Sequence, residues 1–110
     1  MRNAERRNDM GKNVRTQEEF DAATATGSVL VDFWAEWCGP CRMMGERIEK
    51  ELLPAMPNLA IVKVNVDEAP ELAANFSIMS IPTLFCYSGG KKVAEFIGVT
   101  DVRDITKAFV

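Results

Sequence analysis

Two nearly continuous apolar runs, one on each side of a helical pattern, constrain the fold of this chain more than any other feature. The runs are VLVDFW at residues 29–34 and LAIVKVNV at residues 59–66, and both are rich in β-branched side chains. Such runs are typical of parallel strands that are covered on both faces. Between them, apolar side chains recur at steps of three and four, at Cys41, Met44, Ile48 and Leu52. This spacing predicts a helix packed on the sheet, so the three segments should form a right-handed crossover.

The segments before this unit predict a short strand and one helix. A short extended piece is expected at residues 12–15. Thr16 is followed three positions later by Glu19, a pattern that indicates a capping box at the start of a helix. This helix should carry Phe20 on its buried face and end near Gly27.

The segments after the second apolar run predict two more helices and a hairpin. Pro70 is expected to open a short helix that holds Leu72 and Phe76. The segments TLFCYS and KKVAEFI flank Gly89 and Gly90, a pair that favours a tight antiparallel hairpin. Thr100 is expected to cap a last helix, whose inward residues should be Val102, Ile105 and Phe109.

Composition favours one domain and argues against several classes of function. A chain of 110 residues with 47% hydrophobic and 26% charged residues fits one compact domain. We expect a mobile tail at residues 1–11 and one domain at residues 12–110. The formal net charge of −3 provides no basic surface for nucleic acid. No apolar stretch is long enough for a membrane span or a secretory signal, so we expect a cytoplasmic protein without membrane contact.

The stretch FWAEWCGPCRMM places two cysteines, Cys38 and Cys41, directly before the predicted helix. Three cysteines are too few for a disulfide scaffold, and a close pair in a reducing compartment is more often catalytic or metal-binding. The chain has no histidine, and only Cys86 remains as a further thiolate, so a zinc site would lack ligands. We therefore expect no metal, although a site shared between two molecules remains an alternative. Two inert buried thiols are a second alternative.

The spacing of the two cysteines favours a redox pair. Positions i and i+3 in the first turn of a helix lie on one face, close enough for a local disulfide to open and close. Pro40 fits this first turn because its missing N–H has no intrahelical partner to lose. The helix N-terminus should stabilise Cys38 as a thiolate, which makes it the predicted nucleophile. Cys41 continues the buried stripe, so we expect it to be shielded and to make the later resolving attack.

Two charged residues interrupt the apolar runs that should be central strands. Asp32 lies within VLVDFW and Lys63 within AIVKVNV, where apolar side chains are expected. A carboxyl buried there should have a raised pKa and serve as a proton acceptor for Cys41. Asp32 and Lys63 are expected to form a buried pair. The alternatives are a partly solvated strand end for Asp32 and a surface position for Lys63, whose long stem reaches water.

From about Thr16 to Val110, the chain closely resembles the thioredoxin family. The likeness rests on VDFWAEWCGPC, KVNVD at residues 63–67, SIPT at residues 80–83 and FIGV at residues 96–99. It implies an α/β thioredoxin fold, with a central mixed sheet of parallel central strands and an antiparallel C-terminal hairpin, and helices on both faces. It also implies an active site formed by Trp37, Cys38, Gly39, Pro40 and Cys41, with Asp32 and Lys63 as the buried charged pair.

The same resemblance implies a groove that binds substrate segments. Pro82 matches the family's cis-proline and should hold the backbone of Ile81 beside Cys38, where an extended segment can pair. Gly98 has no side chain and should therefore leave the bottom of the groove open. Trp34 and Trp37 should flank it, unless they are ordinary core or surface aromatics.

This chain also departs from the family pattern. Family members usually carry proline five residues after the second cysteine, where this chain has Glu46, so we expect Gly45 to soften the helix instead. The first strand, with Val14 as its one apolar residue, should be short or frayed. Cys86 is expected to be packed core.

The function implied is that of a protein-disulfide reductase working by dithiol exchange through Cys38 and Cys41. The Gly-Pro spacer resembles that of the reducing family members. We expect a monomer that has a redox-active disulfide and no bound cofactor. An NADPH-dependent thioredoxin reductase should recycle it, and its substrates should be proteins that contain disulfides. The alternative is a binding module or partner subunit, in which the groove docks another protein and the thiols are incidental.

Overall fold

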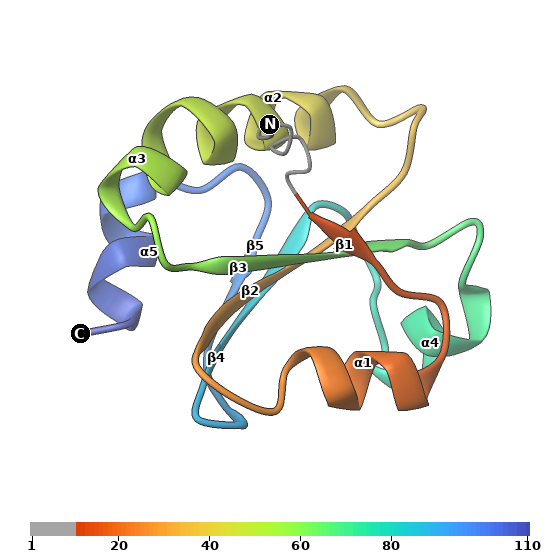
Figure 1. Cartoon of the computed structure of the whole chain (residues 1–110). Helices are drawn as coiled ribbons and strands as arrows, with labels where there is room; N and C mark the ends of the chain where they lie inside the picture. Colours follow the sequence, from red (N-terminus) through yellow and green to blue (C-terminus); the bar gives the residue numbers. More distant parts are fainter. Residues whose placement is uncertain (1–10) are drawn as a thin grey trace, which may run out of the picture.

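The computed structural model describes residues 11–110, so residues 1–10 of the predicted tail lie outside the described part of the chain. Figure 1 shows a central sheet with helices on both faces. In chain order the elements are β1 (Lys12–Asn13), α1 (Gln17–Ala23), β2 (Ser28–Trp34), α2 (Gly39–Arg47), the π-helical turn η1 (Ile48–Leu52), α3 (Leu53–Ala55), β3 (Ala60–Asn65), α4 (Pro70–Asn75), β4 (Thr83–Ser88), β5 (Lys91–Ile97) and α5 (Val102–Ala108).

The sheet is mixed, and its strand order is β1-β3-β2-β4-β5. β2 and β3 pair in parallel, with Asp32 in register with Lys63, and β1 adds to β3 in parallel as a strand of two residues. β4 runs antiparallel to β2, and β5 antiparallel to β4. The two apolar runs are therefore adjacent strands joined by a helical crossover, and the predicted hairpin and short first strand are confirmed.

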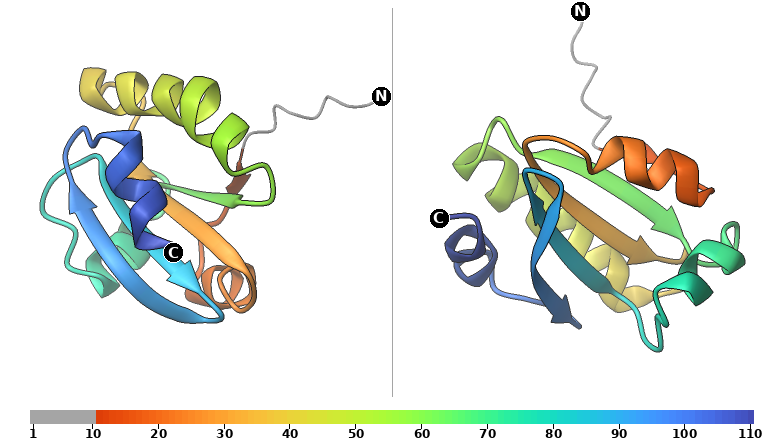
Figure 2. Two further views of the ribbon diagram at one scale, coloured as in Figure 1. Left: turned by 90° about the vertical axis from the view of Figure 1, so that its left-hand side faces the viewer. Right: turned by 90° about the horizontal axis from the view of Figure 1, so that it is seen from below.

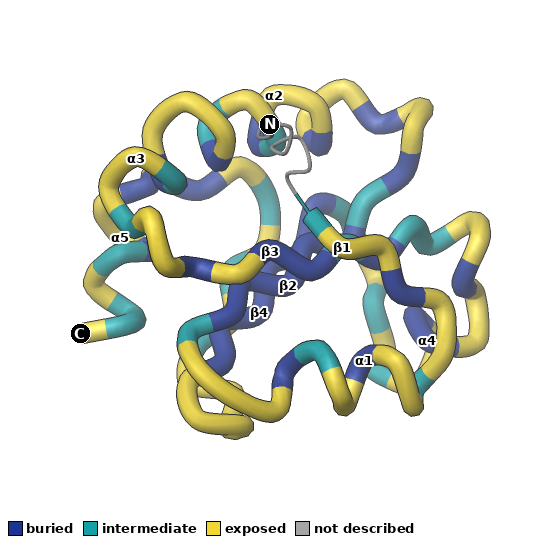
Figure 3. The backbone as a smooth tube through the Cα atoms, in the orientation of Figure 1, coloured by how far each residue is buried: buried dark blue, intermediate teal, exposed yellow. Residues whose placement is uncertain are grey.

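The sheet divides the apolar core into two layers, and Figures 1 and 2 show which helices cover each face. On one face, α1 and α4 cover a cluster rich in aromatic rings, which includes Phe20, Phe33, Phe85 and Tyr87. On the other face, α2 and α5 cover an aliphatic cluster that contains Leu30, Met44, Ile48, Leu84, Cys86 and Ile105. The buried residues of the sheet lie in the central strands β2, β3 and β4 (Figure 3), as expected for strands covered on both faces.

The helix that follows the two cysteines does not stay α-helical throughout. Met44, Ile48 and Leu52 are all buried, so the predicted apolar stripe is confirmed. From Ile48 the helix widens into η1, and the N–H of Leu53 donates to the carbonyl of Ile48, five residues earlier. Pro54 follows directly and lacks the N–H that an α-helix would use, which gives a physical reason for the wider turn before it.

The cap of the last helix differs from the prediction. Asp101, not Thr100, is the N-cap of α5, and its carboxylate accepts the N–H of Arg103 at 2.8 Å. Hydrogen bonds from the side chain and backbone of Arg103 lower the pKa of Asp101 to about 2. The Thr100 hydroxyl instead donates to the carbonyl of Gly98 at 2.9 Å, so it is occupied by the preceding loop.

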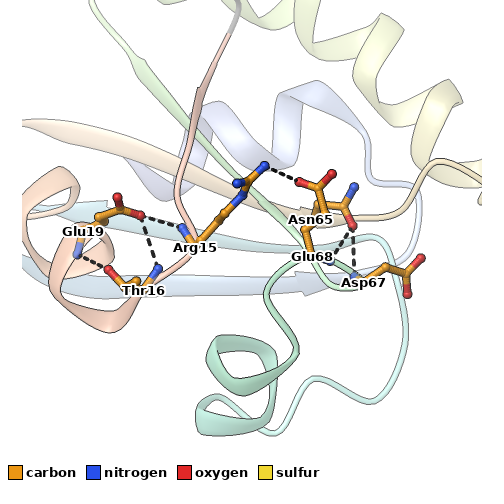
Figure 4. Close-up of polar contacts among 6 residues, drawn as sticks. All are labelled: Arg15, Thr16, Glu19, Asn65, Asp67 and Glu68. Carbon is orange, nitrogen blue, oxygen red and sulfur yellow. Dashed lines mark hydrogen bonds and ion pairs between the residues drawn. The ribbon is translucent and has the colours of Figure 1, made fainter.

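The capping box at the start of α1 is confirmed and provides a stability test. The Thr16 hydroxyl accepts the N–H of Glu19 at 3.1 Å, and the Glu19 carboxylate accepts the N–H groups of Thr16 and Arg15, as Figure 4 shows. We expect Thr16→Ala to lower the free energy of unfolding by about 1 kcal/mol, because one N–H at the helix start loses its acceptor. Urea unfolding measures this change. Thr16→Ser keeps the acceptor and should remain within a few tenths of a kcal/mol of the parent; an equal loss in both variants would contradict a capping role.

Candidate functional site

The two cysteines lie where β2 ends and α2 begins. They are joined by a disulfide, with Cα atoms 5.2 Å apart. Cys38 is the N-cap of α2, and its Sγ accepts the N–H of Cys41 at 3.1 Å. Pro40 occupies the first turn, as predicted. An N–H aimed at Sγ and the positive end of the helix dipole both favour negative charge on Cys38 rather than on Cys41.

The predicted contrast in burial between the two cysteines is wrong. Cys38 is 5% exposed and Cys41 is 4% exposed. Both pack with Ala35, and the half-buried side chains of Trp34 and Ile81 lie against them. In the closed disulfide the two sulfurs share one environment, so exposure does not separate a nucleophile from a resolving thiol. The position of Cys38 at the helix cap is the asymmetry that remains.

Asp32 is buried in the middle of β2, as predicted. The residue is 2% exposed, and its Oδ1 atom has no hydrogen-bond partner. Loss of hydration raises the pKa of this carboxyl from its ordinary value of 3.8 to about 6, while the positive charge of Lys63 acts in the opposite direction. The alternative of a partly solvated strand end is therefore excluded, and Asp32 changes its charge just below neutral pH.

Lys63 faces Asp32 in register, but the predicted buried ion pair is not formed. No salt bridge joins the two side chains, although both lie in the described part of the chain. The ammonium group of Lys63 instead lies 4.3 Å from the centroid of the Trp34 ring. There the ammonium gains a cation–π contact, and its half-buried side chain keeps access to water. A close pair with Asp32 would have required desolvation of both charges.

The loop at Ile81 and Pro82 lies beside the cysteines. The Ile81–Pro82 bond is cis, as predicted, and the carbonyl oxygen of Ile81 lies 3.9 Å from the Sγ of Cys38. Gly98 has a φ of +89°, and its N–H donates to the carbonyl of Pro82 at 2.8 Å. A Cβ at Gly98 would meet no atom within 4 Å, so the surface there is open. The cysteine pair thus borders an open surface formed by two loops.

The two tryptophans have different surroundings. Trp37 is 69% exposed, and its indole N–H donates to a carboxylate oxygen of Asp67 at 2.8 Å. Trp34 is half-buried below Lys63, and its indole N–H has no hydrogen-bond partner. Trp34 therefore packs against the cysteines, while Trp37 lies at the surface next to Cys38 in the sequence and is held by Asp67.

Asp67 is a site residue that the sequence reasoning missed. It follows β3 at the end of the sheet where β2 delivers the cysteine loop. Asn65 fixes the turn, because its side-chain oxygen accepts the N–H groups of Asp67 at 2.9 Å and Glu68 at 3.3 Å (Figure 4). Two parallel strands that end at the same sheet edge were a signal that could have placed Asp67 beside Trp37.

Comparison with known proteins agrees with this geometry. The family model described as Thioredoxin matches residues 12–109. The chain belongs to the thioredoxin family. It is 42% identical to thioredoxin from Chlamydia trachomatis over 94 residues, which covers 86% of this chain and 91% of that protein. It is 51% identical to thioredoxin from Alicyclobacillus acidocaldarius over 70 residues, covering 64% and 67% of the two chains.

Solved thioredoxin structures share the fold. A mutant thioredoxin from Halobacterium salinarum superimposes with a TM-score of 0.78 at 34% identity, covering 90% of this chain and 87% of that one. Oxidised mitochondrial thioredoxin 3 from Saccharomyces cerevisiae gives a TM-score of 0.78 at 29% identity, covering 90% and 92%. Membership of the thioredoxin family and the Cys38–Cys41 disulfide make this protein a thiol–disulfide oxidoreductase.

The described residues contain neither a cluster of potential metal ligands nor a membrane-spanning helix. Within residues 11–110, no group of three or more potential metal ligands is brought together. No helix in the same range is long and apolar enough to cross a membrane.

Proposed function

We propose that this protein works in the reducing direction, as a protein-disulfide reductase that transfers two electrons from its dithiol to substrate proteins. The observation that carries the exchange chemistry is the position of Cys38 at the cap of α2, where its sulfur accepts the N–H of Cys41. A helix start favours the Cys38 thiolate, the species that attacks a disulfide, and it does so for exchange in either direction. The reducing direction is proposed from the Gly-Pro spacer, at Gly39 and Pro40, which resembles that of reducing family members.

The reaction proceeds by two exchanges. The Cys38 thiolate attacks one sulfur of a substrate disulfide, which forms a mixed disulfide and releases the other sulfur as a thiolate. Cys41 then loses its proton and attacks the Sγ of Cys38. The second substrate thiolate leaves, and the Cys38–Cys41 disulfide closes. The substrate gains two electrons and the protein loses two, so no bound cofactor is required.

Asp32 is proposed to accept the proton of Cys41 in the second exchange, directly or through a water molecule. Its carboxyl is buried on the face of the sheet that α2 covers, since its neighbour Leu30 packs with Met44 and Ile48. Because burial raises its pKa to about 6, the carboxylate is present at neutral pH and is basic enough to take up a proton. Lys63 is proposed to adjust the basicity of this carboxylate from its position over Trp34.

Substrate segments are proposed to bind along the loops of Ile81, Pro82 and Gly98. An extended segment would pair with the backbone near Ile81, which places its sulfur beside Cys38. The open surface at Gly98 leaves room for the passing chain. Trp37 would border this groove from the outside, and Trp34 would support it from below.

The partners proposed are disulfide-containing proteins as substrates and an NADPH-dependent thioredoxin reductase as the source of electrons. We further propose that the protein acts as a monomer in the cytoplasm. The domain unit is proposed to be residues 12–110, preceded by a short tail.

The reducing direction can be tested by equilibrium with glutathione. We expect the Cys38–Cys41 couple to have a potential at least about 30 mV below that of glutathione, equivalent to a tenfold or larger preference for the oxidised form. Equilibration with defined ratios of reduced and oxidised glutathione, followed by thiol alkylation and mass measurement, gives this value. A couple more oxidising than glutathione would contradict the reductase proposal.

The third thiol provides the control for this titration. Burial raises the pKa of Cys86 to about 11, so this side chain should not react. In Cys86→Ala the measured potential should be the same as in the parent.

A further inference from the structure

Gly11 lies immediately before β1, against the stem of Lys63. A Cβ atom built on Gly11 would lie 2.7 Å from Cγ and 2.9 Å from Cδ of Lys63, and 3.2 Å from Cγ2 of Ile61. Distances below 3.0 Å essentially do not occur for real Cβ atoms, so a side chain at this position would have to displace the Lys63 stem. Its backbone has no positive φ that would require glycine. The Lys63 stem can therefore occupy this position because Gly11 has no side chain.

The strand order places Lys63 between the β1 edge and Asp32. β1 and β2 flank β3 on opposite sides, and Lys63 of β3 is in register with Asp32 of β2. Trp34 lies on the same strand as Asp32, two residues further along. A side chain added at Gly11 would displace the Lys63 stem at Cγ and Cδ, so the ammonium group would leave its position over the Trp34 ring and its distance to the Asp32 carboxyl would change.

We propose that Gly11 is a positioning residue, which leaves room for the Lys63 stem beside β1 and so holds its ammonium over Trp34, at a fixed distance from Asp32. This inference rests on the proposed role of Asp32 as the proton acceptor for Cys41. An ammonium closer to Asp32 would stabilise the carboxylate and lower its basicity. Gly11 thus acts on the resolving step through Lys63, without contact with the reacting sulfurs.

Among the described residues, the charge that acts on the Asp32 carboxyl is that of Lys63 on β3. Cys38 and Cys41, at the start of α2, are joined in the disulfide of the oxidised protein and do not titrate. Cys86 on β4 lies on the same face of the sheet, but its thiol is neutral at physiological pH because burial raises its pKa to about 11. From α5, the residues that pack on this face are the apolar Val102 and Ile105. A change in the titration of Asp32 on substitution of Gly11 would therefore be transmitted by Lys63.

The test is to titrate the Asp32 carboxyl carbon by NMR in the oxidised full-length protein and in Gly11→Ala. We expect a shift on the order of 0.5 to 1 pH unit, the size produced when the distance between an ammonium and a carboxylate changes by a few ångströms at an effective dielectric constant of about 20. The ring-current shift of the Lys63 ε-methylene protons should shrink in the same sample, because the ammonium leaves the Trp34 ring. An unchanged titration of Asp32 would overturn the proposal.

Two matched variants show whether the effect passes through Lys63. In a Lys63→Met background, Gly11→Ala should leave the titration of Asp32 unchanged; a shift that persisted there would overturn the proposal. Gly45→Ala adds a Cβ that meets no atom within 4 Å and should not move the titration. The pH profile of the resolving step separates the two proposals. If Asp32 shifts but the profile does not, the positioning role of Gly11 stands and the base role of Asp32 is wrong.

Discussion

Cys38→Ser is expected to lose roughly a thousandfold or more of the rate at which the protein reduces a disulfide-bonded test protein, because a serine hydroxyl does not ionise at neutral pH and cannot replace a thiolate. The loss should appear in the rate with which free thiols of the test protein are released in the presence of a dithiol donor. Folding should be retained, since the site lies at a helix cap and serine is a favourable N-cap residue. Activity that survived this substitution would contradict the assignment of Cys38 as the nucleophile.

Cys41→Ser is the matched variant, and it should fail in a different way. With Cys38 intact, the first exchange proceeds but the second does not, so a covalent complex between protein and substrate should accumulate. Non-reducing electrophoresis and mass measurement detect it. Because Cys38 and Cys41 are almost equally buried in the disulfide, this experiment assigns their roles where exposure does not. A complex trapped by Cys38→Ser instead would reverse the assignment.

The same pair of variants also separates catalysis from docking. If the protein were a binding module, a partner protein would bind equally well to the parent, to Cys38→Ser and to Cys41→Ser. The reductase proposal instead expects stable capture by Cys41→Ser alone, and release of the captured protein when a reductant is added.

Asp32→Asn is expected to stabilise the protein at neutral pH. Burial raises the pKa of Asp32 from 3.8 to about 6, so between these values the folded protein holds a proton that the unfolded chain does not. The stability due to this residue is therefore fully present below about pH 4 and lost as the pH rises through 6. Integrated over this range, the ionised carboxylate costs about 3 kcal/mol, which the neutral amide avoids.

The measurement is urea unfolding of both proteins at several pH values. The free energy of unfolding of Asp32→Asn relative to the parent should rise as the pH increases from about 4 to 7 and then level off. Taking the difference between the two proteins cancels the contributions of the other carboxyl groups. A difference that did not depend on pH would show that Asp32 titrates normally in the folded state.

The same substitution should slow the resolving step. A positioned base contributes about a hundredfold or more to a proton transfer, so the breakdown of the mixed disulfide in Asp32→Asn should fall by roughly that factor at neutral pH. Rapid mixing of the reduced protein with a substrate disulfide separates this step from the first exchange, which should be little changed. If breakdown were equally fast across neutral pH, Asp32 would not be the proton acceptor.

The sequence predicted most of the fold because its local signals agree with one another. The runs at residues 29–34 and 59–66 are parallel neighbours, and the capping box at Thr16 is present. The N-cap of α5 was missed because Thr100 and Asp101 both have cap-forming side chains, and the choice depended on the loop carbonyl of Gly98 that binds the Thr100 hydroxyl. Both alternatives are local, so the capping pattern alone did not distinguish between the two adjacent residues.

The structure differs from the predicted site in two of its contacts. Strand alternation placed Asp32 and Lys63 side by side, but it could not weigh the cost of burying an ion pair against a cation–π contact with Trp34. The apolar stripe of the helix correctly predicted that Cys41 is buried. It did not predict that neighbouring loops also bury Cys38. Both errors concern what surrounds a residue in three dimensions.

By itself the sequence determined the crossover, the place of two cysteines at a helix start and the burial of a carboxyl in a central strand, because the hydrophobic period, caps and turns are local properties. Only the tertiary structure decided which atoms those groups meet. The ammonium of Lys63 lies over Trp34, and the Gly11 backbone lies against its stem, because strands distant in the sequence lie side by side in the sheet. Energies of desolvation depend on such neighbours, which no single segment of the chain specifies.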